Sequence, residues 1–372
     1  QISIPYSTHQ PAEPLDKALF ASKLMAWYQA NKRELPWRTT DDPYKIWLSE
    51  IILQQTRVAQ GLPYYQRFVE KYPSVQALAQ AEEEEVLRLW QGLGYYARAR
   101  NLHACARMIV SQLDGKFPST YQALLRLKGV GQYTAGAIAS IAFKESVPVV
   151  DGNVYRVLAR VFGIEEDITS SGGVKAFYAF AQSLVPLQDA DLYNQAIMEF
   201  GALHCTPVNP RCKTCTFQSH CSAFHTCRQH TLPVKVKKIK VKRRFLHYLV
   251  LQCHGQLYMK QRQGRDIWAG LYDFYLVEDE QPKALHELDN VLVSMMKAHA
   301  LQASSTPTLY KHLLTHQQLH VYFYQVQMTP QFFQAAAPLL HQSGSRAFTP
   351  IQVQALPKPF LFIYFLKKEL YL

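Results

Sequence analysis

The stretch 127–156 constrains the fold of this 372-residue chain most, because it joins a glycine turn to a lone carboxylate at a fixed distance. Gly129, Val130 and Gly131 form a Gly-x-Gly turn between two patterns of helical periodicity. The glycines let the backbone approach another molecule closely, and the helix that follows directs free N–H groups outward from its start. Such a site favours anions, so the turn predicts a contact to a DNA phosphate. An ordinary corner between two helices is the alternative.

Asp151 is the carboxylate that follows this turn. The second helix is expected to end near Lys144, and after Pro148 a short apolar pair leads into Asp151 and a new helix. Aspartate is common as the N-cap of a helix, and this is the first interpretation of Asp151. A carboxylate held beside a phosphate-binding turn also suits a position facing a reacting sugar, so both interpretations stay open.

Glu50 is a second carboxylate in an unusual place. The helix predicted to start near Pro43 reads PYKIWLSEIILQQTRVAQ, and Glu50 lies among apolar residues on nearly every side. One interpretation is a narrow polar edge on an amphipathic helix. The other is a half-buried acid, whose pKa burial raises, so that it holds a proton near neutral pH as a general acid requires.

Three segments, LKGVGQYTAGAIA, VPVVDGNVYRVLAR and WLSEIILQQT, resemble the helix-hairpin-helix DNA glycosylase superfamily, and within it the adenine DNA glycosylase branch, the MutY family. Members of this branch remove adenine mispaired with 8-oxoguanine. The resemblance implies an all-α helix-hairpin-helix glycosylase domain in which Glu50 protonates a purine ring nitrogen and Asp151 stabilises the sugar. It also implies that Tyr133 and Asn153 orient the sugar and Asp151.

Tyr133 separates the possible reactions. Bifunctional glycosylase/lyases of this superfamily carry a lysine nucleophile where this chain has Tyr133. Without that amine, the chain is expected to hydrolyse the glycosidic bond and leave the strand largely uncut. The alternatives are an endonuclease III-like glycosylase/AP lyase and a non-catalytic DNA-binding iron–sulfur protein. The second alternative has no use for Glu50 and Asp151.

The same resemblance implies further contacts to DNA. Gln55 and Thr56 match residues at the DNA opposite the flipped base, with a solvent-facing helix end as the alternative. Tyr95 matches the side chain pushed into the base stack beside the oxidised guanine, and its Gly-Leu-Gly-Tyr-Tyr motif suits a wedge. Tyr96 is more typical of a core aromatic residue. The adenine pocket is expected to be lined by Arg33, Trp37 and Arg38.

Four cysteines, Cys205, Cys212, Cys215 and Cys221, form one compact loop with unequal gaps. A structural zinc site more often shows two separate Cys-x-x-Cys pairs, so this spacing favours four thiolates around a [4Fe-4S] cluster, with zinc as the alternative. It is also the pattern of the iron–sulfur loop in the family that the chain resembles. The total of seven cysteines is odd, which argues against a complete disulfide framework and for a reducing compartment.

The C-terminal third changes from helical to alternating periodicity, which predicts an α+β domain after a basic linker. Its segment GRDIWAGLYDFYLV resembles the MutT-like, Nudix-like domain of adenine glycosylases. The acidic run that holds magnesium in the hydrolases is missing, so this domain is expected not to hydrolyse nucleotides. Thr315 and His316 match the lesion-sensing Phe-Ser-His loop of the family, whereas Leu314 replaces its phenylalanine.

The whole chain is thus predicted to be multidomain. The expected parts are an N-terminal arm (1–14), the glycosylase domain with its iron–sulfur loop (15–228 and 205–221), a basic linker (229–244) and the MutT-like lesion-recognition domain (245–372). A net charge of +12 predicts an acidic partner. The expected partner is double-stranded DNA with adenine opposite 8-oxoguanine or guanine, bound by a monomer. No membrane association is expected, and the expected location is the cytoplasm, at the nucleoid if the chain is bacterial.

Overall fold

The computed structural model describes residues 13–236, 241–303 and 306–372. These residues belong to two compact units, and each unit collects segments that are apart in the sequence. The first unit comprises Gln1–Val58, Lys71–Ala79 and Ala104–Lys237, and the second comprises Ala59–Glu70, Gln80–His103 and Lys238–Leu372. The sequential domain boundaries given above stay a prediction.

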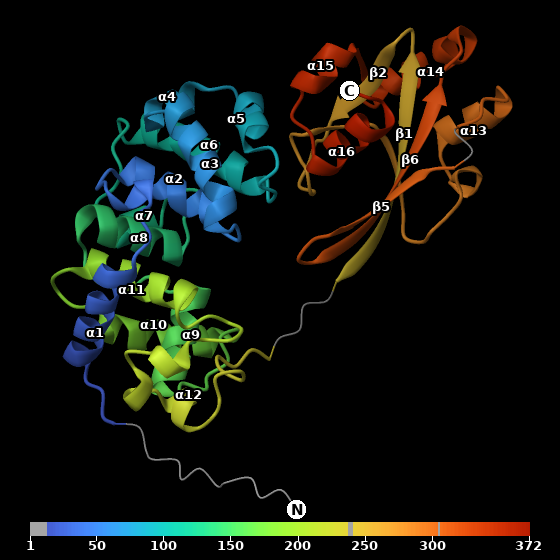
Figure 1. Ribbon diagram of the computed structural model, residues 1–372. Helices are drawn as coiled ribbons and strands as arrows, with labels where there is room; N and C mark the ends of the chain where they lie inside the picture. Colours follow the sequence, from blue (N-terminus) through green and yellow to red (C-terminus); the bar gives the residue numbers. More distant parts are fainter. Residues whose placement is uncertain (1–12, 237–240, 304–305) are drawn as a thin grey trace, which may run out of the picture. The chain divides into compact units, whose positions relative to one another are not determined.

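Every regular element that the structure describes in the first unit is a helix (Figure 1). Its elements are α1 (Lys17–Asn31), η1 (Pro36–Arg38), α2 (Pro43–Leu53), α4 (Val75–Gln80), α7 (Tyr121–Leu124), α8 (Gln132–Phe143), α9 (Gly152–Phe162), α10 (Ser171–Leu184), α11 (Ala190–Leu203), η2 (Cys212–Thr214), η3 (Gln218–His220) and α12 (Ser222–His225). Asp16, Asp42, Asp151 and Ser170 cap helix starts by accepting backbone N–H bonds. A core that includes Phe20, Val157, Phe177, Phe200 and Phe217 joins α1, α9, α10 and α11.

One predicted helix is divided in two. The pattern PYKIWLSEIILQQTRVAQ was expected to be continuous, but α2 ends at Leu53 and α3 (Val58–Lys71) begins after a turn. Gln55 has a φ of 54°, a left-handed conformation that a right-handed helix does not accommodate. The expected end of α8 near Lys144 is confirmed, because Lys144 has a φ of 60° and terminates that helix.

The second unit contains a mixed sheet together with α3 and α5 (Glu83–Trp90), and α6 (Ala97–Gln112) contributes residues to both units. Its strands are β1 (Lys242–Cys253), β2 (Gln256–Gln261), β3 (Tyr272–Asp273), β4 (Tyr275–Asp279), β5 (Thr308–Leu313), β6 (Gln317–Gln327) and β7 (Arg346–Phe348). The strand order is β3-β2-β1-β6-β5, with β4 paired to β1 and β7 to β2. The central strands β1 and β6 are parallel, with Lys242 opposite Gln317 and Gln252 opposite Gln327.

Helices cover both faces of this sheet (Figure 1). They are η4 (Leu285–Glu287), α13 (Val291–Ala298), α14 (Pro330–Gln342), α15 (Pro350–Ala355) and α16 (Phe360–Glu369). The helices α13 and α14 close a core over one face, with Leu292 and Phe332 against Leu249 and Leu251. On the other face the ring of Phe365 stacks on Phe323, with centroids 4.1 Å apart. The predicted α+β domain is therefore confirmed.

The strand β1 begins at Lys242, inside the range predicted as the linker, whose bounds stay a prediction. Arg244 is buried and donates to Glu278 (Nε to Oε1, 2.6 Å) and to Asp266 (Nη1 to Oδ1, 2.8 Å). Its charge is therefore compensated by carboxylates of the second unit. Positions 237–240 of the predicted linker and 1–12 of the predicted arm lie outside the described residues. Within the described parts of the chain, no helix is long and apolar enough to cross a membrane.

Candidate active site

The glycine turn leads directly into α8. Gly129 has a φ of 76°, which glycine adopts without a steric penalty, and the N–H of Val130 donates to the carbonyl of Leu127 (3.2 Å). Gly131 is the N-cap of α8 and has no side chain to bond the first N–H groups of the helix. These N–H groups therefore point outward from the helix start, as expected for an anion site. The Val130 side chain is buried, and its N–H is used inside the turn. The exposed parts of this motif are Gly129 and Gly131, and their contact to DNA stays a prediction.

Glu50 is buried on α2, with a residue exposure of 8%, and buried neighbours such as Trp47 and Ile51 surround it. The hydroxyl of Tyr133, on the facing helix α8, donates to Oε2 of Glu50. Burial raises the pKa of Glu50 to about 7, and the hydrogen bond from Tyr133 opposes this rise. The buried-acid interpretation of Glu50 is thus confirmed, and a pKa of about 7 lets this acid hold a proton near neutral pH.

Asp151 caps α9, as its first interpretation predicted. One carboxylate oxygen, Oδ1, accepts the backbone N–H groups of Asn153 and Val154, both at 2.8 Å. The other, Oδ2, accepts Nδ2 of Asn153 at 2.7 Å. Burial raises the pKa of Asp151, while these three hydrogen bonds lower it by stabilising the charged form. The charge of Asp151 in turn raises the pKa of Glu50, so the two carboxyl groups lie close enough to interact.

The supporting residues divide between the two acids. Asn153 binds Asp151, as expected, but Tyr133 binds Glu50. Tyr133 therefore positions the general-acid candidate, and within the described residues its hydroxyl makes no hydrogen bond to Asp151. Its expected role toward the sugar and Asp151 stays a prediction. The Tyr133 hydroxyl also lies 3.7 Å from the sulfur of Met198 on α11.

Arg156 is a buried residue next to the site that the sequence analysis did not single out. It is buried on α9, and its Nη2 donates to Oδ1 of Asn153 (2.8 Å) and to the carbonyl of Gly201 (2.7 Å). Its Nε donates to the carbonyl of Cys205 (2.7 Å). Arg156 thereby holds the partner of Asp151, the helix α11 and the cysteine loop together. An arginine inside the apolar pattern VYRVLARVF was the available signal.

Gly201 explains how α9 and α11 approach so closely beside Asp151. A Cβ atom at Gly201 would lie 2.6 Å from Cβ and 2.9 Å from the carbonyl oxygen of Asn153. Any larger residue would therefore displace Asn153, and with it the hydrogen bonds that hold Asp151. The sequence gives no sign of this requirement, because it arises from the contact between two helices.

Two of the three predicted pocket residues, Arg33 and Arg38, bind a carboxylate that the sequence analysis also missed. Glu199 is 1% exposed on α11, and Arg33 and Arg38 each make a bidentate pair with it, at distances of 2.5–2.9 Å. Although burial alone raises its pKa, the bonds from both arginines lower the pKa of Glu199 to about 2. Trp37 lies between the two arginines in the sequence and is buried on η1. The signal for Glu199 was the same as for Glu50, an acid inside an apolar helix.

Replacing Glu199 with glutamine is expected to destabilise the fold by about 3 kcal/mol at pH 7, because two guanidinium groups lose the carboxylate that compensates them. The folded-state pKa of Glu199 is lowered, so its stabilisation is present above its ordinary pKa of 4.5 and is lost as the pH falls toward 2. Urea unfolding at pH 7 and pH 4 measures both effects. The exposed Glu84→Gln variant is the control. A loss below 1 kcal/mol would show that the arginines do not depend on Glu199.

The four cysteines of the predicted cluster site lie in one loop and interact with one another. Burial raises the pKa of Cys215 to about 12 and of Cys221 to about 11, and the other cysteines of the loop add to both shifts. Burial and the neighbouring Cys205 also raise the pKa of Cys212. None of the four forms a disulfide. Within the described residues, no three His, Cys, Asp or Glu side chains form a group that would hold a metal ion.

Hydrogen-bond donors are directed at these sulfur atoms. The guanidinium of Arg160 donates to Sγ of Cys205 (3.5 Å), and the N–H of Phe217 donates to Sγ of Cys215 (3.4 Å). Such donors stabilise thiolates bound to a metal centre. Two of the four sulfur atoms thus accept hydrogen bonds, whereas Sγ of Cys221 donates to the carbonyl of Arg160 (3.3 Å).

The second unit brings two predicted lesion contacts together. Tyr95 is 46% exposed with a φ of 48°, and its hydroxyl lies 2.6 Å from Oγ1 of Thr315 in the turn between β5 and β6. His316 follows in that turn, and its carbonyl accepts the N–H of Lys242 (2.9 Å). Tyr96 is buried, which confirms its interpretation as a core aromatic residue. In the first unit, Gln55 is exposed, and the N–H of Thr56 donates to Leu53 (3.1 Å).

Comparisons with known proteins agree with this geometry. Residues 48–176 match the model of the HhH-GPD superfamily base excision DNA repair protein, and residues 247–368 match a NUDIX domain. The chain is 32% identical over 304 residues to the adenine DNA glycosylase of Buchnera aphidicola subsp. Schizaphis graminum, covering 82% of this chain and 86% of that protein.

Two further similarities are more local. The chain is 46% identical over 234 residues to the adenine DNA glycosylase of Mus musculus, covering 60% of this chain and 45% of that protein. The structure of a thermostable thymine-DNA glycosylase matches with a TM-score of 0.53 and 30% identity, covering 57% of this chain and 97% of that one. With a buried acid, a capped aspartate and these relatives, the chain belongs to the adenine DNA glycosylase family of base-excision-repair enzymes.

Proposed function

We propose that this enzyme removes adenine mispaired with 8-oxoguanine, and with guanine, from double-stranded DNA. The adenine is flipped out of the helix and its N-glycosidic bond is hydrolysed, without cleavage of the strand. The observation that carries this proposal is the pairing of Glu50, whose pKa is about 7, with Asp151, whose carboxylate accepts three hydrogen bonds. Glycosidases divide their work in the same way between a raised-pKa acid and an ionised partner.

The reaction follows from the protonation states of these two groups. Protonated Glu50 donates its proton to N7 of adenine, which makes the base a better leaving group. As the bond between C1′ and N9 breaks, the sugar gains positive charge, and the Asp151 carboxylate stabilises it. Glu50, now ionised, accepts a proton from the water that attacks C1′. The proton on Glu50 is thereby restored, and the products are free adenine and an abasic site.

Tyr133 supports hydrolysis over lyase chemistry. A lyase forms a Schiff base with an amine at this position, and a phenol has no such chemistry. The hydroxyl of Tyr133 is moreover bonded to Glu50 and positions the acid. The extrusion of adenine costs a few kcal/mol, and we assign its compensation to Tyr95 as a wedge and to the turn at Gly129 and Gly131 as a phosphate contact.

We further infer that Cys205, Cys212, Cys215 and Cys221 hold a [4Fe-4S] cluster. The support is their spacing, their mutual interaction and the donors from Arg160 and Phe217 to sulfur. When bound, such a cluster would fold the loop. Residues Arg211 and Lys213 of the same loop would then contact DNA phosphates. The enzyme is proposed to act as a monomer on DNA, in the cytoplasm at the nucleoid if the source is a bacterium.

Single-turnover excision from a duplex with adenine opposite 8-oxoguanine tests the proposal, with products analysed before and after hot alkali. Strand cleavage that requires alkali is the expected result, because hydrolysis leaves an intact abasic strand. Cleavage without alkali would mean that an amine acts as nucleophile. Absence of excision would refute the assignment of substrate.

The pH dependence of the same reaction is expected to be bell-shaped. The active form has Glu50 protonated, so the rate should fall about tenfold per pH unit above the Glu50 pKa of about 7. The rate should also fall in acid, where Asp151 gains a proton, and this limb lies above pH 3.8 because burial raises the Asp151 pKa. Single-turnover rates between pH 3.5 and 9 measure both limbs. A rate that stays constant from pH 7 to 9 would exclude Glu50 as the acid.

Thr315→Ala is expected to reduce the preference for 8-oxoguanine over guanine opposite adenine by about fivefold. The variant removes the hydroxyl that is bonded to Tyr95, a contact worth about 1 kcal/mol. The ratio of single-turnover rates on the two duplexes measures this preference. Thr315→Ser keeps a hydroxyl and is the matched control. Equal rates on both duplexes in the parent enzyme would contradict the proposed role of this loop.

A further inference from the structure

The turn 91–96, which carries Tyr95, has an unusual backbone. Gly92, Gly94 and Tyr95 have φ values of 103°, 74° and 48°, all in the left-handed region. Glycine adopts this region freely, but a tyrosine there is strained and needs support from its surroundings. Part of this support is local, because Nε1 of Trp90 donates to the carbonyl of Gly94 (2.9 Å).

Tyr96 connects this turn to the C-terminal residues. Its side chain is buried, and the N–H of Gly92 donates to its hydroxyl oxygen (3.4 Å). The hydroxyl in turn donates to the carbonyl of Lys358 (3.4 Å), in the segment 356–359 between α15 and α16. Burial raises the pKa of Tyr96 to about 12, so the hydroxyl keeps its proton and stays a donor at neutral pH. One hydroxyl therefore bridges the turn and a residue that is 262 positions away.

Gln91 makes a second bond to the same residue. Its Oε1 accepts the backbone N–H of Lys358 (3.0 Å). Lys358 is itself well fixed, because it is 3% exposed and its Nζ donates to the carbonyls of Val353 (2.5 Å) and Leu356 (2.7 Å). A cation in this place satisfies carbonyl groups at the end of α15. The turn is thus bonded at both of its ends, through Gln91 and Tyr96, to one fixed position.

A third contact lies farther along α6. Nη1 of Arg100 donates to the carbonyl of Ala269 (2.5 Å), in the loop between β2 and β3. The next residue, Gly270, has a φ of 82°, and a Cβ atom there would lie 3.0 Å from Cδ1 of Leu87 on α5. The helices α5 and α6 therefore approach this loop closely. All of these residues belong to the second unit, which also contains Thr315.

We propose that Gln91 and Tyr96 are positioning residues that hold Tyr95 against Thr315 and thereby set the preference for 8-oxoguanine opposite adenine. This inference rests on the proposed function, in which Tyr95 is the wedge and Thr315 is a lesion contact. The hydroxyl of Tyr95 lies 2.6 Å from Oγ1 of Thr315, and a shift of about 1 Å would break this hydrogen bond.

A fixed wedge discriminates better than a mobile one. When Tyr95 and Thr315 share one support, insertion of the ring also places the Thr315 hydroxyl at the neighbouring base, so the contact depends on which guanine is present. A turn released from Lys358 would insert beside either guanine at its own angle. Ordering it on the DNA would then cost conformational entropy that the bonded turn has already lost.

The first test measures the preference as the ratio of single-turnover rates on duplexes with 8-oxoguanine and with guanine opposite adenine. Tyr96→Phe keeps the buried ring and removes the bridging hydroxyl, and Gln91→Ala removes the acceptor for the Lys358 N–H. Each variant is expected to lower the ratio about threefold, as the loss of one neutral hydrogen bond does. The rate opposite 8-oxoguanine should fall more than the rate opposite guanine. Gln91→Glu keeps an acceptor and should restore the ratio.

A double-mutant cycle shows whether Tyr96 acts through the wedge. Thr315→Ala alone is expected to lower the ratio about fivefold, because it removes the hydrogen bond to Tyr95. When Tyr96→Phe is added, the ratio should fall no further, since the contact that Tyr96 positions is already absent. A combined loss of about fifteenfold, the product of the two single effects, would show that the residues act independently and would overturn the proposal.

A fluorescence measurement follows the wedge without excision. The duplexes carry 2-aminopurine next to the 8-oxoguanine, on one side or the other, and a 2′-fluorine on the opposing adenosine, which blocks excision by destabilising the positive charge on the sugar. Insertion of Tyr95 unstacks the step and should increase the fluorescence when the parent enzyme binds. Tyr96→Phe should give at most about half of this increase at saturation. An equal increase would overturn the proposal even if the parent removed no adenine, a result that would refute the proposed function separately.

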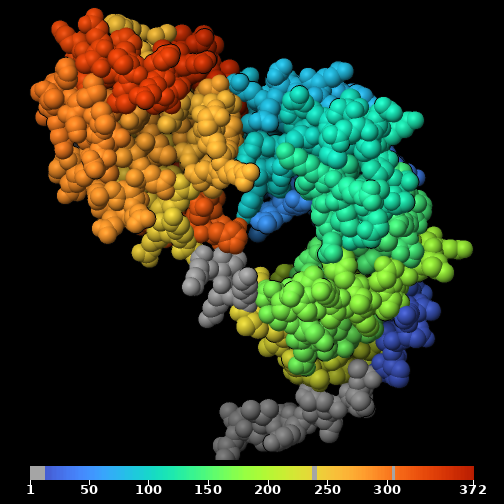
Figure 2. All heavy atoms as spheres, turned by 180° about the vertical axis from the view of Figure 1, so that it is seen from behind, coloured from blue at the N-terminus to red at the C-terminus, as the bar shows by residue number. Residues whose placement is uncertain are grey.

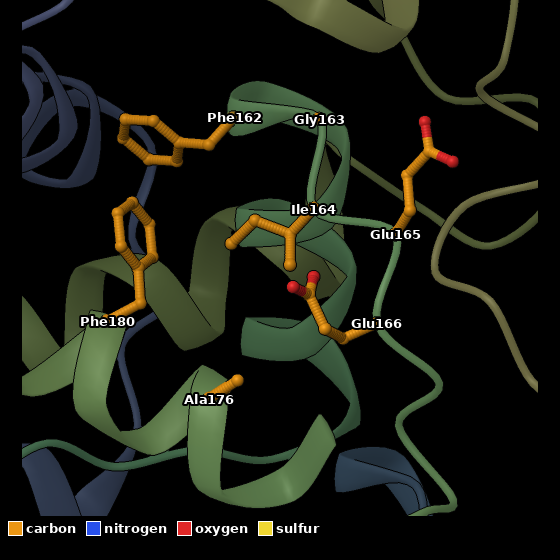
Figure 3. Close-up of a pocket in the computed structure, with 7 residues that line it drawn as sticks. All are labelled: Phe162, Gly163, Ile164, Glu165, Glu166, Ala176 and Phe180. Carbon is orange, nitrogen blue, oxygen red and sulfur yellow. The ribbon is translucent and has the colours of Figure 1, made fainter. Parts of the chain in front are cut away.

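Two control variants make the test specific. Tyr275→Phe, on β4, loses a bond of the same length (3.4 Å) from Asn290 in the same unit. Glu166→Gln lies in the first unit, where the green atoms of this part of the chain are at the surface (Figure 2). The carboxylate of Glu166 points into an open hollow of about 690 Å³ beside α9 and α10 (Figure 3). Both controls should keep the ratio of the parent.

Outcomes of these rate measurements would also overturn the proposal. A loss of preference in Tyr275→Phe as large as in Tyr96→Phe would show a general effect of weakened packing. Equal reductions of both rates in Tyr96→Phe would show that its hydroxyl supports the fold and does not set the preference.

Discussion

Glu50→Gln is expected to slow excision of adenine by roughly 10³-fold while DNA binding is retained, because glutamine has no proton to donate. Glutamine has nearly the same shape and can still accept the hydrogen bond from Tyr133. The comparison is made by single-turnover kinetics at pH 7, with duplex affinity measured separately. A reduction below about tenfold would show that another group supplies the proton.

The same variant is expected to be more stable than the parent at alkaline pH. The folded-state pKa of Glu50 is about 7 against an ordinary value of 4.5, so the stabilisation from its proton is complete below pH 4.5 and is lost as the pH rises through 7. The difference corresponds to a free energy of unfolding on the order of 3 kcal/mol. Urea unfolding should therefore give a larger stability for Glu50→Gln at pH 8.5 and similar stabilities at pH 4.5.

Tyr133→Phe separates positioning from proton donation. The hydrogen bond from Tyr133 lowers the pKa of Glu50, so its removal should raise that pKa and move the alkaline limb of the rate profile upward. Excision should slow less than in Glu50→Gln, because the proton donor is still present. An unchanged limb would show that the hydroxyl does not act through Glu50.

Asp151→Asn is the second substitution with a large expected effect, a loss of roughly 10²–10³-fold in the excision rate. The variant removes the negative charge that faces the sugar in the transition state. Asparagine is as good an N-cap as aspartate, so the bonds from the N–H groups of Asn153 and Val154 are expected to persist. Loss of activity with a nearly unchanged fold is therefore the signature of an electrostatic role.

One hydrogen bond nevertheless changes in this variant. In the parent enzyme, Nδ2 of Asn153 donates to Oδ2 of Asp151. In the variant, the side-chain amide of residue 151 can place a second N–H donor at this position. Rotation of Asn153 is opposed by Arg156, which donates to its Oδ1. We expect a cost of about 1 kcal/mol. Asp16→Asn, at the N-cap of α1, is the matched control, and equal losses of activity in both variants would refute the role of Asp151.

Much of the site was accessible from the sequence because its signals are local. An acid among apolar residues predicted the burial of Glu50, and an aspartate after a proline break predicted the cap of α9. The change from helical to alternating periodicity predicted the α+β fold of the C-terminal residues. Each of these depends on neighbours within a few positions of the chain, where side-chain spacing and capping act directly.

Contacts between distant segments were not accessible in this way. Glu199 is paired with Arg33 and Arg38 across more than 160 positions, and the sequence assigned both arginines to adenine without finding their carboxylate. Gln55 interrupted a continuous apolar pattern with a left-handed φ, although no glycine or proline marked the break. The hydrogen bond from Tyr133 to Glu50 was not predicted either, because helix packing determines which carboxylate its hydroxyl reaches.

Local spacing and side-chain chemistry were enough to predict helix starts, the two fold classes and two candidate acids. The pKa values of those acids and their hydrogen-bond partners follow instead from the packing of separate helices. The pKa of Glu50 depends on burial under α8, and the orientation of Asp151 depends on Asn153, Arg156 and the close approach at Gly201. Desolvation and hydrogen bonding arise when separate helices pack, and no local pattern records which atoms that packing brings together.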